Sequence, residues 1–209
     1  MKIIEPNVSL EQEIETEKIM KHIEKAGRVC YKSENNISND SADIFIRNIL
    51  KRGHESVIEH ISITFKIVCD RGVTHEIVRH RIASFSQEST RYCNYSQDKF
   101  GNELTFIKPC FWSEDSENFK LWKDMMEKIE ERYFELLGNK VSPQEARSIL
   151  PNSLKTEIYV TMNLREWRHF LKLRTSKAAH PQMRQIAIMI YDIFAEKLPV
   201  VFEDIIIDK

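Results

Sequence analysis

Residues 61–69, which read Ile-Ser-Ile-Thr-Phe-Lys-Ile-Val-Cys, give the clearest structural signal in this 209-residue chain. Apolar and polar residues alternate almost strictly along this stretch, and that period of two is typical of a strand with one buried face. The apolar positions are Ile61, Ile63, Phe65, Ile67 and Cys69. We therefore predict a strand over 61–69 that ends at Asp70-Arg71-Gly72.

Helices are predicted on the N-terminal side of this strand. Ser9 and Gln12 have the spacing of a capping box, which predicts a helix that begins there and ends near Gly27. The polar stretch 33–41 predicts a loop. A second helix follows, and Gly53 stands at the left-handed position just beyond its end.

The C-terminal side mixes helices with further strands. Thr74 is expected to cap a short helix that runs into Arg79, and the aperiodic residues 82–102 are predicted to be a functional loop. The remaining elements predicted by periodicity and capping are a strand at 104–107, a helix at 116–137 closed by Gly138, a short helix from the Ser142–Glu145 capping box that stops before Pro151, a strand at 154–162, helices at 164–174 and 182–197, and an ambiguous apolar segment at 200–207.

This order of elements favours an α+β fold. Helices and strands do not alternate with βαβ regularity, and the sequence has no Gly-rich phosphate loop, which disfavours a doubly wound fold. The sequence has no internal repeat and no linker-like break. We therefore predict a single domain over 1–209.

Composition excludes several classes of protein. Hydrophobic residues make up 42% and charged residues 30%, as in a folded globular chain rather than a disordered one. The net charge of −1 argues against a general nucleic-acid binder, and no apolar run is long enough to span a membrane. The four separated cysteines and the lack of a signal-peptide core predict a cytoplasmic protein with reduced thiols.

The densest group of chemically active residues lies between Arg79 and Arg91. It holds three arginines, a histidine and three serines, and arginine forks suit the oxygens of phosphates and carboxylates. A solvated basic turn is the alternative. Apolar residues interrupt the polar ones, which favours a loop that binds an anionic ligand.

Two further groups flank this one. His54-Glu55-Ser56 and Glu59-His60 precede the 61–69 strand, where a histidine and carboxylates suit proton transfer, although a turn with satisfied polar groups explains them equally well. On the helix at 164–174, Arg174 lies beside an apolar stripe. A guanidinium that is desolvated there needs an anionic partner.

Several other motifs are excluded by spacing. His75 and His80 are five residues apart instead of four and do not share a helix face, so we predict no metal site. The sequence has no G-x-S-x-G, G-x-G-x-x-G or P-loop motif, which disfavours a nucleophile elbow and the common nucleotide folds.

The pattern Arg-His-Arg, two residues, Ser, four residues, Ser, one residue, Arg resembles the signature of flavin-dependent thymidylate synthases. Its fixed positions are filled by Arg79, His80, Arg81, Ser84, Ser89 and Arg91. Three more segments are similar to that family: Gly53–Ser56 with Glu59-His60, Ala146-Arg147 with Leu150-Pro151, and Asn163-x-Arg165 with His169 and Leu173-Arg174.

The resemblance implies both a fold and an activity. The fold would be a twisted antiparallel β-sheet flanked by helices, assembled as a homotetramer whose active sites are shared between subunits. The activity would be reductive methylation of dUMP to dTMP, with methylenetetrahydrofolate as the carbon donor and FAD, reduced by NADPH, as the hydride source. Neither nucleic acid nor a membrane is expected as a partner.

The resemblance also implies roles for individual residues. Arg174 would be catalytic at the uracil ring, where its charge favours activation of C5, and His54 would be a catalytic-site histidine that positions the flavin and folate. The residues expected at FAD are Ser56, Arg79, His80, Arg81, Gln87, Asn163, Arg165 and His169. Those expected at dUMP are Glu76, Ile77, Val78, Arg79, Gln87, Glu88, Ser89, Thr90, Arg91, Arg147 and Arg174.

Two alternative functions stay open at this point. One is a flavoprotein that oxidises NADPH but leaves its nucleotide site idle, and the other is an RNA- or nucleotide-binding module that uses the arginine-rich loop. The influence of Glu76 and Gln87 on dUMP contacts, and any role of His180, are also open.

Overall fold

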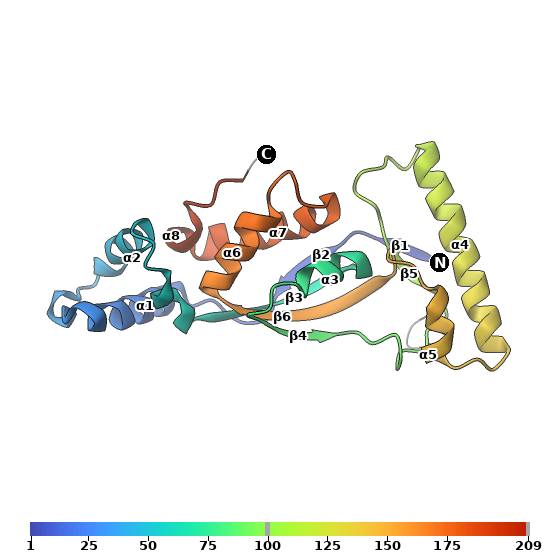
Figure 1. Ribbon diagram of the computed structural model, residues 1–209, viewed down its shortest axis with the longest axis horizontal. Coiled ribbons are helices and arrows are strands. Elements are labelled where there is room, and N and C mark those ends of the chain that lie inside the picture. Colours follow the sequence, from blue (N-terminus) through green and yellow to red (C-terminus); the bar gives the residue numbers. More distant parts are fainter. Residues whose placement is uncertain (99–100, 208–209) are drawn as a thin grey trace. The chain divides into compact units, whose positions relative to one another are not determined.

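The computed structural model describes residues 1–98 and 101–207, and it combines helices with two β-sheets (Figure 1). The α+β class is confirmed. The chain divides into two compact units: unit 1 is Met1–Asn7, Ile67–Arg79 and Phe85–Tyr159, and unit 2 is Val8–Lys66, His80–Ser84 and Val160–Lys209.

The larger sheet has the strand order β2-β3-β6-β4. Its strands are β2 (Asn7–Leu10), β3 (Ser62–Asp70), β6 (Lys155–Asn163) and β4 (Ser84–Gln87). The expected antiparallel arrangement is confirmed by β3 and β6, because Leu164 N donates to Ile61 O at 2.9 Å and the hydroxyls of Thr64 and Thr161 lie 2.8 Å apart. Both long strands run from one unit into the other.

Unit 2 is mainly helical. Its helices are α1 (Thr16–Tyr31), η1 (Glu34–Asn36), α2 (Ser41–Lys51), η2 (Glu55–His60), α6 (Leu164–Arg174), α7 (Pro181–Lys197) and α8 (Pro199–Phe202). In Figure 1, α1 lies beside α2 and α6 beside α7. Trp167 of α6 is fully buried against Phe65 and Phe194, and its indole N–H donates to Ile63 O at 3.0 Å. These contacts hold α6 on β3, and burial of each aromatic ring stabilises the unit by about 1.5–3 kcal/mol.

Unit 1 carries the remaining elements. They are β1 (Lys2–Ile4), α3 (Arg71–Ile77), β5 (Thr105–Ile107), α4 (Glu117–Gly138), α5 (Pro143–Ala146) and η4 (Arg147–Ile149). Strands β1 and β5 form a parallel pair that the sequence did not predict. The core of this unit includes Tyr95, Phe106, Tyr133 and Leu154.

The predicted start and end of the first helix are wrong. Ser9 lies in strand β2, and α1 begins at Thr16 and continues past Gly27 to Tyr31. Gly27 serves close packing instead of helix termination, because a Cβ at this position would lie 2.5 Å from the ring of Phe45. The left-handed residue that ends the helix is Lys32, with φ of 48°.

Three other boundaries are corrected by the structure. Helix α3 begins at Arg71 and is capped by Asp70, whose Oδ1 accepts from Val73 N at 2.8 Å, so Thr74 is not its cap. The predicted loop 82–102 contains strand β4. Gly138 lies within the last turn of α4, and the left-handed residue after that helix is Lys140.

The other predicted elements are confirmed, within a few residues at their ends. They include the Ser142–Glu145 capping box, with Pro143 in the first helical turn, and the ambiguous segment is helical at Pro199–Phe202. All four cysteines are thiols. Across residues 1–98 and 101–207, every helix is too short or too polar to cross a bilayer.

Candidate active site

The residues predicted to form the site fall into two groups, one in each unit. Unit 2 contains His54, Ser56, His80, Arg81, Asn163, Arg165, His169 and Arg174. Unit 1 contains Glu76, Ile77, Val78, Arg79, Gln87, Glu88, Ser89, Thr90, Arg91 and Arg147.

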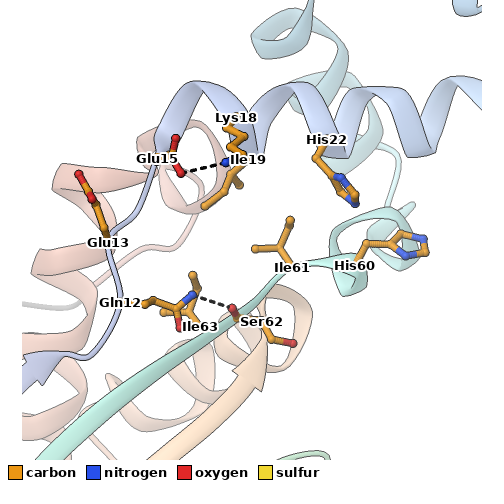
Figure 2. A pocket seen from close by; sticks show the side chains of 10 residues that line it. All are labelled: Gln12, Glu13, Glu15, Lys18, Ile19, His22, His60, Ile61, Ser62 and Ile63. Atoms are coloured by element: carbon orange, nitrogen blue, oxygen red, sulfur yellow. Dashed lines mark hydrogen bonds and ion pairs between the residues drawn. The ribbon is translucent and has the colours of Figure 1, made fainter.

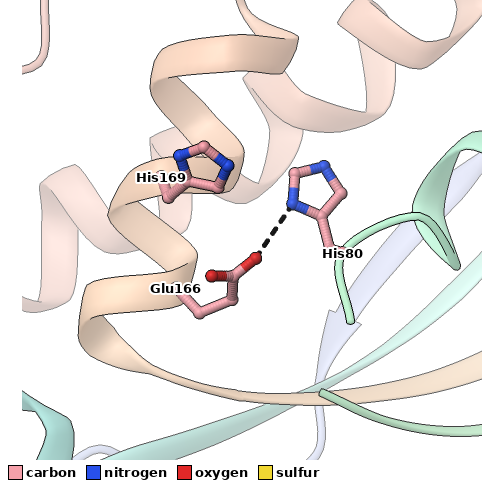
Figure 3. A group of neighbouring side chains, drawn as sticks. All are labelled: His80, Glu166 and His169. Atoms are coloured by element: carbon pink, nitrogen blue, oxygen red, sulfur yellow. Dashed lines mark hydrogen bonds and ion pairs between the residues drawn. The ribbon is translucent and has the colours of Figure 1, made fainter. Parts of the chain in front are cut away.

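In unit 2, His80 is the centre of a buried polar cluster. Its side chain is almost entirely enclosed, and Nδ1 lies 3.0 Å from Glu166 Oε1 (Figure 3). Arg174 Nε donates to Nε2 of the same ring at 3.1 Å. The ring also packs against Phe170, with centroids 4.8 Å apart, and tilts toward His169 at 5.6 Å. The structure thus brings three predicted residues together and adds Glu166 to them.

These contacts determine the protonation state of His80. An arginine is always protonated and can only donate, so Nε2 of His80 accepts and carries no proton. The proton of the neutral ring is therefore on Nδ1, where it is donated to Glu166. Burial and the positive charge of Arg174 lower the pKa of His80, although the hydrogen bond to Glu166 opposes the shift.

Helix α6 explains why these groups meet. Asn163 caps the helix, and its side-chain oxygen accepts from Glu166 N at 2.9 Å. Glu166, Phe170 and Arg174 then follow at intervals of four residues, which places them on one face of the helix. The cap therefore sets the rotation at which this face meets His80.

A cavity of about 530 Å³ lies beside the cluster. It is lined by Glu55, Glu59, Ile82, Asn163, Arg165, Glu166 and His169. Arg165 and His169 are exposed, and Arg165 Nη1 lies 2.5 Å from Glu59 Oε1. Three residues predicted at the flavin thus line one cavity.

The donors in unit 2 fit the phosphates and polar ring atoms of a flavin dinucleotide. Arg81 and Arg165 are exposed guanidiniums, which bind phosphate oxygens well, and Asn163 and His169 add amide and imidazole groups. Glu59 pairs with Arg165 and so offsets part of this charge.

The segment that carries His54 is ordered by a helix C-cap. Gly53, with φ of 73°, follows α2 as predicted, and its N–H donates to Leu50 O at 2.9 Å. His54 N donates to Ile49 O at 2.9 Å, which completes a Schellman motif. The exposed ring of His54 then lies with Nδ1 2.8 Å from the hydroxyl of Tyr31.

Helix η2 continues from His54 and is held by a buried arginine. Arg168 of α6 is 1% exposed and donates to Glu55, to both oxygens of Asp204, and to the carbonyl of Val201. Ser56, predicted at the flavin, is exposed on the same short helix. Arg168 therefore ties the segment of predicted site residues to α6.

In unit 1, the side chain of Gln87 forms hydrogen bonds within the unit. Its amide nitrogen donates to the hydroxyls of Thr74 at 3.0 Å and Thr156 at 3.3 Å, which joins β4 to α3 and β6. Ile77 is fully buried, so only its backbone is available for the contact with dUMP that we predict. Val78 and Arg79, which follow it, are exposed.

The segment after β4 contains both inward and outward side chains. The carboxylate of Glu88 accepts from the Tyr95 hydroxyl at 2.9 Å and pairs with Lys155 at 3.1 Å. Thr90 is buried, and Ser89 is half-buried. Arg91 is exposed, as is Arg147 at the start of η4, so both guanidiniums are accessible on this unit.

Three residues that support the site were not predicted from the sequence: Glu166, Arg168 and Tyr31. Glu166 follows Asn163 by three residues, which is the spacing of a helix cap and its partner, and this signal could have drawn attention to it. Arg168 and Tyr31 carry no local signal, because their partners are far away in the sequence.

His80, Glu166 and His169 also place ligand atoms within 4.8 Å of one another, a spacing suited to a metal ion. The guanidinium of Arg174 lies 3.1 Å from His80, however, and would repel a second cation. We therefore assign the cluster to hydrogen bonding.

A second cavity in unit 2, of about 310 Å³, lies between the start of α1 and the start of β3 (Figure 2). Gln12 Nε2 donates to Ser62 O at 3.1 Å across it. His22 and His60 stand at one end, with ring centroids 6.4 Å apart. Among the residues that the structure describes, none of those predicted for the catalytic, FAD or dUMP site lines this cavity.

Comparisons with a family model and with known relatives agree on one family. The family model described as thymidylate synthase complementing protein matches residues 14–200. A flavin-dependent thymidylate synthase of Pyrococcus furiosus is 41% identical over 152 residues, which cover 72% of this chain and 62% of that protein. One of Corynebacterium aurimucosum is 34% identical over 200 residues, covering 87% and 78%.

A solved structure is also similar. The UMP/dUMP methylase PolB of Streptomyces cacaoi, bound with 5-bromo-dUMP, superposes with a TM-score of 0.80 and 25% identity, covering 97% of this chain and 96% of that one. The family model thus covers residues 14–200, and the structural similarity covers 97% of the chain. The chain belongs to the family of flavin-dependent thymidylate synthases.

Proposed function

We propose that the protein converts dUMP to dTMP, with methylenetetrahydrofolate as the carbon donor and NADPH-reduced FAD as the source of hydride. The observation that carries this proposal is the family match over residues 14–200, which contains every residue of the Arg79–Arg91 signature. The similar structure bound with 5-bromo-dUMP supports a uridylate nucleotide as the substrate.

Arg174 has the central chemical role in this proposal. Methylation at C5 of uracil needs negative charge to develop on the ring, and a fixed guanidinium stabilises that charge. The contact of Arg174 with His80 uses Nε, and in this proposal its terminal nitrogens bind the ring oxygens of dUMP. Removal of one such contact should cost about 2–4 kcal/mol in the transition state.

The other predicted residues bind and position. The exposed Arg91 and Arg147 supply charge for the phosphate of dUMP, and Ser89, two residues before Arg91, adds a hydroxyl. The residues that would hold FAD are Ser56, Arg79, His80, Arg81, Gln87, Asn163, Arg165 and His169. When bound and reduced, FAD supplies the hydride that completes the methyl group. His54, held by Tyr31, would orient the folate against it.

We further propose a homotetramer with shared active sites, located in the cytoplasm. Arg79, Arg81 and Arg165 are exposed in a single copy of the chain, as expected for residues whose site is completed by another subunit. Single copies should therefore bind FAD poorly. Sedimentation velocity with and without FAD tests this: a monomer that binds FAD tightly would contradict shared sites.

The experiment that tests the activity is an anaerobic assay with [5-³H]dUMP, methylenetetrahydrofolate and NADPH. Tritium release that requires FAD and accompanies dTMP formation is the expected result. Arg174→Ala should lower turnover about 30- to 900-fold while FAD stays bound, from the 2–4 kcal/mol above. Arg132→Ala, which removes an exposed arginine of α4, is the matched control and should leave turnover unchanged. NADPH oxidation without tritium release would instead indicate a flavoprotein that has lost its nucleotide chemistry.

A further inference from the structure

Glu166 occupies an unusual position beside the proposed active site. Glu166 is 9% exposed, and its carboxylate lies 3.0 Å from His80 Nδ1. Its backbone N–H is held by the cap residue Asn163 at 2.9 Å, so the start of α6 fixes its place. It is the acceptor that the Nδ1 proton of His80 reaches.

Glu166 determines whether Nε2 of His80 can accept a hydrogen bond from Arg174. A neutral imidazole carries one proton, and a carboxylate beside Nδ1 holds that proton there. Nε2 is then an acceptor, as the 3.1 Å contact from Arg174 Nε requires. Without Glu166 the proton is free to move to Nε2, where it would oppose the N–H of Arg174 donor to donor.

We propose that Glu166 is a positioning residue that orients the guanidinium of Arg174 through His80. The inference rests on the proposed function, in which Arg174 acts on the uracil ring. An arginine side chain has about 2 kcal/mol of rotamer entropy, and a hydrogen bond at Nε fixes the plane of its fork. The terminal nitrogens are thereby aimed before the nucleotide arrives, which reduces the entropic cost of binding.

The surroundings of His80 support this arrangement. Within residues 1–98 and 101–207, the charged and titratable groups that face its ring are Glu166, His169 and Arg174, all on α6. A second proton on His80 would remove the acceptor for Arg174 and add a repelling charge. Burial and Arg174 lower the pKa of His80, which keeps the ring neutral below the pH at which an ordinary histidine protonates.

The first test compares two variants of Glu166 in the FAD-loaded protein. Glu166→Ala removes the acceptor and should weaken dUMP binding, measured by calorimetry, by about tenfold, as expected for one lost hydrogen bond. Glu166→Gln retains an acceptor oxygen and should stay within about twofold of wild type. Glu196→Ala, which removes an exposed carboxylate of α7, is the control.

Several results would overturn the inference. Glu166→Ala that folds and binds dUMP as well as wild type would do so. Equal losses in the Ala and Gln variants would show that charge or folding, and not the acceptor, is responsible.

The second test reads the tautomer directly and does not depend on dUMP binding. In protein labelled with ¹⁵N-histidine, His80 should show a protonated Nδ1 and a bare Nε2 at pH 7.5, with the signal identified by its loss in His80→Gln. An Nε2-protonated His80 would refute the proposed hydrogen-bond relay, in which Glu166 orients Arg174 through His80. If wild type binds no dUMP but His80 has the expected tautomer, the proposed function fails while the hydrogen-bond relay stands.

Discussion

Replacing Arg168 by methionine should markedly lower the denaturant concentration at which unit 2 unfolds. The guanidinium is 1% exposed and forms a two-point contact with Asp204, Nη1 to Oδ1 at 2.6 Å and Nη2 to Oδ2 at 2.7 Å. Nε and Nη2 also lie 3.2 Å from Glu55 Oε1. One side chain therefore joins α6, η2 and the segment after α8, and methionine fills similar space without any of these bonds.

The size of the loss in stability depends on Glu55 and Asp204, the two carboxylates that the substitution leaves without their partner. Breaking a buried ion pair on one side typically costs about 3–5 kcal/mol. The side chains of Glu55 and Asp204 are 21% and 51% exposed, so water takes over part of their solvation, and we expect about 2–4 kcal/mol. Arg168→Lys keeps the charge but not the fork, and it should cost about half as much.

The same pair predicts a pH dependence. The hydrogen bond and charge of Arg168 lower the pKa of Asp204 below its ordinary value of 3.8. A carboxyl group whose folded pKa is depressed contributes stability above its unfolded pKa and loses it as pH falls through the folded pKa. The stability difference between wild type and Arg168→Met should therefore be complete at pH 7 and shrink below about pH 4.

Urea denaturation followed by circular dichroism measures these differences. The thermal midpoint should fall by roughly 4–16 °C, from 2–4 °C for each kcal/mol in a chain of this size. Arg132→Met, at an exposed ion pair of α4, is the control and should show no measurable loss. Wild-type stability in Arg168→Met, or a larger loss in Arg168→Lys than in Arg168→Met, would refute the reasoning.

Three smaller predictions concern the supports of the proposed site. Asp70→Ala removes the cap of α3 and should lower the free energy of unfolding by about 1–2 kcal/mol in urea denaturation; an unchanged value would mean that the cap is redundant. Tyr31→Phe removes the hydrogen bond to His54 and should lower kcat about two- to tenfold with little change in stability; a kcat equal to wild type would show that His54 needs no such support. Gln87→Glu replaces a donating amide by an acceptor and should cost about 1–3 kcal/mol, whereas greater stability would contradict the hydrogen bonds assigned to Gln87.

Local patterns in the sequence were sufficient for much of the fold and for the family. The alternation over 61–69 predicted β3, the Ser142–Glu145 spacing predicted the start of α5, and Gly53 predicted the end of α2. Each of these signals depends on neighbours within a few residues, whose geometry is set by backbone periodicity. The Arg79–Arg91 signature likewise identified the family, because its fixed positions lie in one short segment.

Other features depended on partners distant in the sequence, and only the tertiary structure decided them. Gly27 packs against Phe45 within α1 instead of ending it, because the space beside it is filled from another helix. The proton of His80 is placed by Glu166 and Arg174, which lie more than eighty residues away. A sequence pattern shows which side chains share a face of one element. Which residue of another element meets that face is decided by packing, and here that packing sets the charge, tautomer and orientation of the proposed catalytic arginine's partner.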